Sequence, residues 1–190
     1  MLTVGLIVEG DYDAVVLTEL IHKCVGADID VIARVCGPKG ALMGRFPGFL
    51  EGFRYMKQGT HVDKALVVRD ADRKDPGVLR ESMEAKITRR TYPFSVQLVV
   101  IIQELETWLL ADSAALSQVT QEYAGRVVSG INEPLEDIVD PKRRLQRLLS
   151  DAKVAYTREV ARKIAAAIRL ESIEARCPSF RTFRQAVGDF

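Results

Sequence analysis

The amino-acid sequence predicts an α/β protein with a three-layer, Rossmann-like fold, in which helices cover a mainly parallel sheet of about four strands. Two observations support this fold class. Four short runs of apolar and β-branched residues are nearly continuous rather than alternating, which is typical of parallel strands buried on both faces. Stretches with helical spacing of apolar residues separate these runs, as βαβ crossovers require.

The expected strands are residues 2–8, 29–35, 64–68 and 95–102. Helices are expected from Asp11, over 41–56, over 76–90 and over 103–110. Asp11 is a favourable N-cap residue, and Pro76 suits the first position of its helix. Pro47 is expected to distort or interrupt the helix over 41–56, because proline removes an intrahelical hydrogen bond.

The chain is expected to form an α/β core over residues 1–112 and a helical C-terminal extension over 113–190 that packs on the core. After Asp112 the strand pattern stops. A short helix over 113–119 and a polar, glycine-containing stretch lead to three helices after Pro141. The second of these three is expected to run unbroken through Leu170.

The composition is that of an ordinary soluble globular protein of 190 residues, 47% hydrophobic and 28% charged, with a formal net charge of only +1. A chain of this length can bury one sizeable core. Because the net charge is close to zero, contact with nucleic acid has to come from a local basic patch. No apolar run approaches the ~20 residues that a membrane-spanning helix needs, so no membrane association is expected.

The cysteines and the N-terminus predict a cytoplasmic protein. Cys24, Cys36 and Cys177 are widely spaced and lack the paired spacing of a zinc site or a disulfide framework, which fits a reducing compartment. The first residues lack the basic start of a signal peptide and reach an acidic residue, Glu9, directly after the first strand.

Acidic residues follow three of the four expected strands. Glu9 follows the first strand; Asp70 and Asp72 follow the third; Glu104 and Glu106 follow the fourth. The carboxyl ends of parallel strands meet at the edge of the sheet where α/β proteins bind ligands. Carboxylates gathered there repel one another unless a cation or a proton intervenes, and hard oxygen ligands in such number suit Mg²⁺ or Mn²⁺. These five residues are therefore predicted to form a metal site.

Basic residues near the same edge predict a phosphate-containing substrate. Lys39 lies in the loop after the second strand, while Arg69, Arg73 and Lys74 flank the Asp-x-Asp pair. Ammonium and guanidinium groups stabilise phosphate oxygens and developing negative charge. Two metal ions about 4 Å apart would also bracket a phosphodiester. The expected chemistry is phosphoryl transfer at a phosphodiester.

Each acidic motif, taken alone, has a plainer interpretation that stays open. Asp70 and Asp72 could be turn or cap residues. Glu104 and Glu106 could be first-turn helix residues favoured by the helix dipole. Only their common placement at strand ends favours a shared site.

Two further features are interpreted as structural. Trp108, the only tryptophan, is expected to pack in the core rather than to stack on a nucleic-acid base. Arg143, Arg144 and Arg147 could belong to a nucleic-acid track, but a solvated helix face is the favoured interpretation.

The order of the acidic motifs resembles the Toprim domain, which topoisomerases, bacterial primases, recombination-repair proteins and overcoming-lysogenization-defect nucleases share. The resemblance rests on strand-Glu-Gly at 4–10, with Asp13 three residues further on, and on strand-Asp-x-Asp at 66–72. It implies that Glu9, Asp70 and Asp72 are catalytic. Glu9 would act as general acid/base or metal ligand, the two aspartates would bind Mg²⁺, and Glu104 or Glu106 would complete a two-metal site.

The sequence also departs from that domain. Arg73-Lys74-Asp75 follows the Asp-x-Asp pair, where topoisomerases and primases often carry acidic or glycine residues. No counterpart of the catalytic tyrosine of topoisomerases can be identified, so strand passage is not expected.

A closer resemblance, over nearly the whole chain, is to small Toprim-like proteins of unknown function that are often encoded beside an ATPase of the kind found in phage-defence systems. It rests on the stretch 104–112, on Asp140-Pro-Lys142 and on Cys177-Pro-Ser-Phe180. It implies an effector that works with an ATPase. Because the sequence has no P-loop pattern, that ATPase would be a separate chain.

These observations predict a Mg²⁺- or Mn²⁺-dependent nuclease, with DNA favoured over RNA, and leave a homodimer open. The alternative is a non-catalytic Toprim-like module that docks on an ATPase or on nucleic acid. A receiver-like phosphoacceptor is disfavoured, because the fourth strand ends on Gln103-Glu104 without a hydroxyl residue and no fifth strand ending in lysine is apparent.

Overall fold

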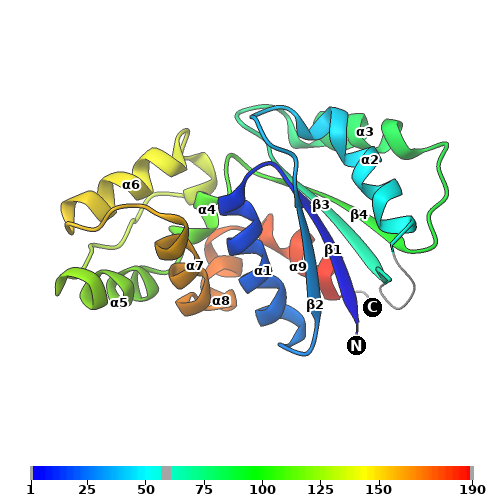
Figure 1. Cartoon of the computed structure of the whole chain (residues 1–190). Coiled ribbons are helices and arrows are strands. Elements are labelled where there is room, and N and C mark those ends of the chain that lie inside the picture. The colour runs from blue at the N-terminus through cyan, green and yellow to red at the C-terminus, as the bar shows by residue number, and fades with distance from the viewer. Residues whose placement is uncertain (1, 57–60, 189–190) are drawn as a thin grey trace.

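Four parallel strands form one sheet in the order β2-β1-β3-β4 (Figure 1). The strands are β1 (Thr3–Val8), β2 (Asp30–Val35), β3 (Lys64–Asp70) and β4 (Ser95–Ile101). The structure is a computed structural model and describes residues 2–56 and 61–188. The predicted α/β class with a parallel sheet is thus confirmed.

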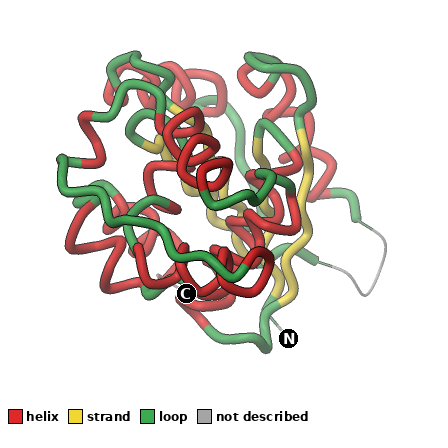
Figure 2. The backbone as a smooth tube through the Cα atoms, turned by 90° about the vertical axis from the view of Figure 1, so that its left-hand side faces the viewer, coloured by secondary structure: helices red, strands yellow, loops and turns green. Residues whose placement is uncertain are grey.

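Helices cover both faces of the sheet. α2 and α3 lie on one face, while α1 and α9 lie on the other, and α7 packs against α1 (Figure 1). Figure 2 shows helices on both sides of the strands. The helices are α1 (Asp11–Val25), α2 (Leu42–Arg54), α3 (Pro76–Ile87), α4 (Glu106–Leu109), α5 (Ser113–Ala124), α6 (Pro141–Asp151), α7 (Arg158–Ala167), α8 (Leu170–Arg176) and α9 (Phe180–Gly188), with a 3-10 turn, η1 (Leu135–Asp137). No helix within the described ranges is both long and apolar enough to cross a lipid bilayer.

Strand β1 is buried on both faces, which explains its continuous apolar sequence. Leu6 and Val8 face α1 and the C-terminal helices, whereas Ile7 faces α2. Gly5 lies on the α2 side, where an added Cβ would come within 2.5 Å of Phe53 Cε2. The glycine therefore lets the Phe53 ring lie directly against the strand.

The C-terminal helices share a continuous apolar core with the sheet. Trp108 is 1% exposed, and its ring packs edge-on against Phe180 at a centroid distance of 4.9 Å, so its predicted role in core packing is confirmed. Asp112 is buried at the start of α5 and accepts hydrogen bonds from the backbone N–H and the side-chain Nε–H of Arg169. These contacts fix residues beyond 112 onto the α/β core.

Several element boundaries differ from the prediction. Pro47 does not interrupt α2, because the flanking Phe46 and Leu50 are buried against the sheet and packing outweighs the lost hydrogen bond. The helix expected through Leu170 breaks at Ile168, which is extended (φ −64°, ψ 140°), where the neighbouring Arg169 is held by Asp112. The helix expected over 113–119 continues to Ala124.

Three other differences bear on the site. β3 continues two residues beyond its predicted end and includes Asp70, because its pairing with β4 extends to Asp70 and Ile101. The N-cap of α1 is Gly10 rather than Asp11. The helix expected from residue 103 is reduced to the single turn α4.

Candidate functional site

The site lies where the connections of the sheet change direction. The chain passes from β1 to β2 on one side and then crosses to β3 on the other side of β1. In such a sheet, ligands bind in the crevice beyond the carboxyl ends of the two central strands. Glu9 directly follows β1, and Asp70 is the last residue of β3. The predicted strand-end carboxylates therefore lie at this crevice.

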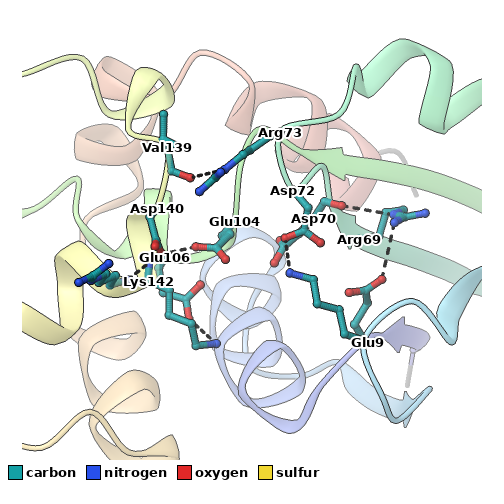
Figure 3. A network of polar contacts seen from close by, with 12 residues as sticks. Glu9, Arg69, Asp70, Asp72, Arg73, Glu104, Glu106, Val139, Asp140 and Lys142 are labelled. Atoms are coloured by element: carbon teal, nitrogen blue, oxygen red, sulfur yellow. Dashed lines mark hydrogen bonds and ion pairs between the residues drawn. The ribbon is translucent and has the colours of Figure 1, made fainter.

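A pocket of about 340 Å³ opens at this edge of the sheet (Figure 3). Five carboxylates contribute to its wall: Glu9, Asp13, Asp70, Asp72 and Glu104. Two cations, Lys39 and Lys142, also contribute. We call this cavity the acidic pocket. It brings together four of the five predicted metal ligands, and Glu106 is not part of its wall.

The backbone at this edge is strained at two neighbouring turns. Asp72 (φ 48°), Arg73 (φ 67°) and Gln103 (φ 62°) occupy the left-handed region, which side-chain-bearing residues rarely adopt. The two turns are joined, because the Asp72 N–H donates to the Gln103 carbonyl at 3.0 Å. This bond holds Asp72 beside the segment that carries Glu104.

The ionised forms of Asp70 and Asp13 are disfavoured by burial and by the neighbouring carboxylates. Burial, followed by repulsion from Asp13, Glu106, Asp72 and Glu104, raises the pKa of Asp70 well above its usual range. Burial also raises the pKa of Asp13 to about 6, although a hydrogen bond from the Gly10 N–H (2.9 Å) to Asp13 Oδ2 partly opposes this. Two groups that resist ionisation in this way would be stabilised by a bound cation.

Asp13 was absent from the predicted ligand set. An aspartate in the first turn of a helix has a sufficient local explanation, because it interacts favourably with the helix dipole. Its position three residues after Gly10 was part of the Toprim resemblance and was the one available signal. Its place in the acidic pocket follows from the tertiary structure, in which the start of α1 and the end of β3 line the same cavity.

Glu9 has one oxygen without a hydrogen bond. Its Oε1 is buried and accepts none from the described residues, although Arg69 Nη2 lies 3.9 Å away. Burial raises the pKa of Glu9, and the charge of Arg69 opposes that rise. A carboxylate with a spare oxygen and a raised pKa is suited to bind a cation or to exchange a proton.

Arg69 is not placed as a phosphate contact. Because β3 continues past it, its side chain is only 6% exposed, and its Nε–H donates to the Asp70 carbonyl at 3.3 Å. It lies behind the wall of the acidic pocket, where it balances the charge of Glu9 (Figure 3).

The other predicted phosphate contacts take different positions. Lys39 reaches into the pocket mouth, where its Nζ lies 2.8 Å from Asp72 Oδ1; this hydrogen bond raises the pKa of Lys39. Arg73 lines an adjoining hollow, and its Nε–H donates to the Val139 carbonyl at 3.4 Å. Lys74 is exposed and lies outside both cavities.

Glu104 and Glu106 have different partners, and both involve Lys142 of α6. Glu104 Oε2 accepts from the Lys142 backbone N–H at 3.0 Å, and the side chain borders the pocket. Glu106 Oε1 accepts from the Tyr156 hydroxyl at 3.0 Å and lies 3.1 Å from Lys142 Nζ. Lys142 and Tyr156 could not be assigned to the site from sequence, because each lies far along the chain from the carboxylates.

The donor set fits a hard divalent cation, although its side chains are not yet gathered around one. Within residues 2–56 and 61–188, no three Asp, Glu, His or Cys side chains are grouped to hold a metal ion as they stand. The pocket nonetheless offers carboxylate oxygens in excess of its two lysines. Oxygen donors of this kind are the ligands that Mg²⁺ and Mn²⁺ prefer.

Fold and site together define an α/β protein with a carboxylate-lined pocket at the carboxyl edge of a parallel sheet. Residues 8–188 match the family described as "Domain of unknown function (DUF4276)", and the chain belongs to this family. The matched range contains every residue of the acidic pocket. Comparison with curated proteins and with solved structures gave no significant match.

Proposed function

We propose that this protein is a Mg²⁺- or Mn²⁺-dependent phosphoryl-transfer enzyme that acts on nucleic acid, with nuclease-like chemistry. One observation carries the proposal: Glu9, Asp13, Asp70, Asp72 and Glu104 converge on one pocket at the switch point of the sheet. Carboxylates whose pKa is raised by burial and mutual repulsion gain most from a divalent cation. The Toprim resemblance supports the same assignment.

The carboxylates of the acidic pocket would have two roles, metal binding and proton transfer. Asp70, Asp72 and Asp13 would hold the metal, with Glu104 as a further oxygen donor. When bound, such a metal supplies Lewis-acid stabilisation of a phosphoryl oxygen and lowers the pKa of a water molecule. Glu9 would move a proton as general acid/base, because its Oε1 has no hydrogen-bond partner among the described residues and burial raises its pKa.

The two lysines assist in different ways. The Lys39 side chain is 74% exposed at the pocket mouth, so it can leave Asp72 and bind a phosphate oxygen. Lys142 would position the two glutamates, because it contacts both of them. Burial disfavours the charge of Lys142, but the negative charge of Glu106 outweighs this effect and raises the pKa of Lys142. Lys142 therefore stays protonated and keeps α6 attached beside Glu104.

The resemblance also sets the expected context. We propose a cytoplasmic protein that acts on DNA in preference to RNA. It would work with an ATPase encoded as a separate chain, as the effector of a phage-defence system.

Calorimetric titration with Mn²⁺ tests the metal site directly. We expect wild-type protein and the control Glu81→Gln, an exposed position on α3, to bind Mn²⁺ equally, and Asp70→Asn to bind it far more weakly. The proteins should then be incubated with supercoiled DNA, single-stranded DNA and RNA. We expect wild type and Glu81→Gln to cleave nucleic acid and Asp70→Asn not to cleave it. Equal cleavage by Asp70→Asn, or none by wild type even with the ATPase, would refute the proposal.

A non-catalytic docking module is the second candidate. It is favoured by the ion pairs of Lys39 with Asp72 and of Lys142 with Glu106, which already neutralise two carboxylates without a metal. The Mn²⁺ titration separates the two functions, because a docking module would bind no Mn²⁺, or would bind it equally well with and without the Asp70 carboxylate.

A further inference from the structure

A second hollow of about 570 Å³ runs along the surface of α6. Three arginines, Arg143, Arg144 and Arg147, line it, and Asp140 lies at its end nearest the acidic pocket. We call it the arginine groove. The sequence favoured a solvated helix face for these arginines, but a hollow lined by them offers a binding surface.

The arginine groove is continuous with the acidic pocket. A third, smaller hollow of about 270 Å³ shares Lys39, Asp72 and Glu104 with the acidic pocket. It shares Asp140 with the arginine groove. Arg73 lines this connecting hollow, and Figure 3 shows its side chain between Asp72 and Val139. One surface path therefore leads from the carboxylates, past Arg73, onto α6.

The positive charge of the arginine groove is largely uncompensated. Arg143 and Arg147 are exposed and form no ion pair with any described residue. Arg144 pairs with Glu133 at 3.4 Å. The Asp140 carboxylate is engaged at the helix start, where it accepts from the Arg143 backbone N–H at 3.3 Å. Arg143 and Arg147 are one turn apart, about 6 Å along the helix axis, so both face the same hollow.

We propose that the arginine groove binds the phosphate backbone of the nucleic-acid strand whose scissile phosphate enters the acidic pocket. The inference rests on the proposed function and adds the route of the strand to it. Carboxylates repel every phosphate except the one that meets a bound cation, so the flanking phosphates need positive charge outside the pocket. Arg73, Arg143 and Arg147 supply it in that order along the path.

Strand binding can be measured separately from cleavage in the Asp70→Asn background, by fluorescence anisotropy with a labelled oligo-dT over a series of KCl concentrations. The test variant adds Arg143→Gln and Arg147→Gln. The matched control adds Lys86→Gln and Arg181→Gln, which remove the same charge from exposed positions on α3 and α9 that form no ion pair with described residues. Glutamine favours helix nearly as well as arginine does, so both proteins should fold.

The groove variant should bind the strand about tenfold more weakly than the control. The slope of log affinity against log salt should decrease in magnitude by about 1.4, because each lost phosphate contact removes about 0.7 for single strands. Equal affinity and slope in the two variants would overturn the inference, while Mn²⁺ binding and cleavage by the wild type would leave the proposed function standing. If the parent protein binds no strand, both the groove assignment and the nucleic-acid substrate are wrong.

Discussion

Glu106 and Lys142 form a 3.1 Å ion pair that joins the single-turn helix α4 to the start of α6. The Glu106 side chain is 4% exposed, and its Oε1 also accepts from the Tyr156 hydroxyl. Its neighbour Glu104 instead borders the acidic pocket. The two glutamates, equivalent in the sequence, therefore have separate positions: Glu106 links α4 to α6, and Glu104 lines the acidic pocket.

Substitution of each glutamate should separate these roles. Glu106→Gln should lower the free energy of unfolding by about 1–3 kcal/mol, because it leaves a partly buried Lys142 without its ionic partner. Glu104→Gln should leave thermal stability nearly unchanged but weaken Mn²⁺ binding about tenfold, because an oxygen donor loses its charge. Chemical denaturation and calorimetry measure the two effects. A loss of stability in Glu104→Gln together with a loss of Mn²⁺ affinity in Glu106→Gln would contradict these separate roles.

The Lys39 ammonium group is paired with Asp72, so under the proposed function it would compete with the metal for that carboxylate. Because its side chain is 74% exposed, Lys39→Met should change the unfolding free energy by less than about 1 kcal/mol. It should strengthen Mn²⁺ binding severalfold, since Asp72 no longer has a cationic partner, yet slow nucleic-acid cleavage. Weaker Mn²⁺ binding by this variant would show that Lys39 supports the metal site rather than opposing it.

The metal-free protein should become more stable on mild acidification. Burial raises the pKa of Asp13 from 3.8 to about 6, so between these values the folded state holds a proton that the unfolded state has lost. The resulting stabilisation of the folded state is fully present below pH 3.8 and is lost as the pH rises through about 6. Thermal midpoints in chelator should therefore increase from pH 7 to pH 5, as the order of these pKa values requires.

Two comparisons check the origin of this pH dependence. Asp13→Asn has no proton to exchange and should show a shallower profile. Saturating Mn²⁺ should have the same effect in the wild type, because the cation replaces the proton as the partner of the carboxylates. An unchanged profile in Asp13→Asn would assign the effect to other groups.

Gly5 tests the packing of the sheet against α2. Gly5→Ala should destabilise the fold by about 1–3 kcal/mol, because the new methyl group would lie 2.5 Å from the Phe53 ring. Gly48→Ala within α2 is the matched control, since no atom lies within 4 Å of an added Cβ there, and it should stabilise by about 0.4–1 kcal/mol. If Phe53→Leu fails to relieve the Gly5→Ala effect in denaturant unfolding, the steric explanation is wrong.

The strands could be predicted because each leaves a local pattern. β1 and β3 are buried on both faces, so each contains a run of consecutive apolar residues, and the acidic residues that follow these runs stand out in the sequence. Arg69 illustrates the limit of this approach. A charged residue after an apolar run marked the apparent end of the strand, yet pairing with β4 carries β3 past it and buries its side chain.

The sequence by itself determined the α/β class and the position of Glu9, Asp70, Asp72 and Glu104 at one edge of the sheet, because periodicity and strand ends are local properties. The tertiary structure alone decided that Asp13 joins them, that Glu106 does not, and that the arginines of α6 border the same surface path. These facts depend on contacts between distant segments, such as the bond between the Lys142 N–H and Glu104, 38 residues apart. No local pattern records such contacts.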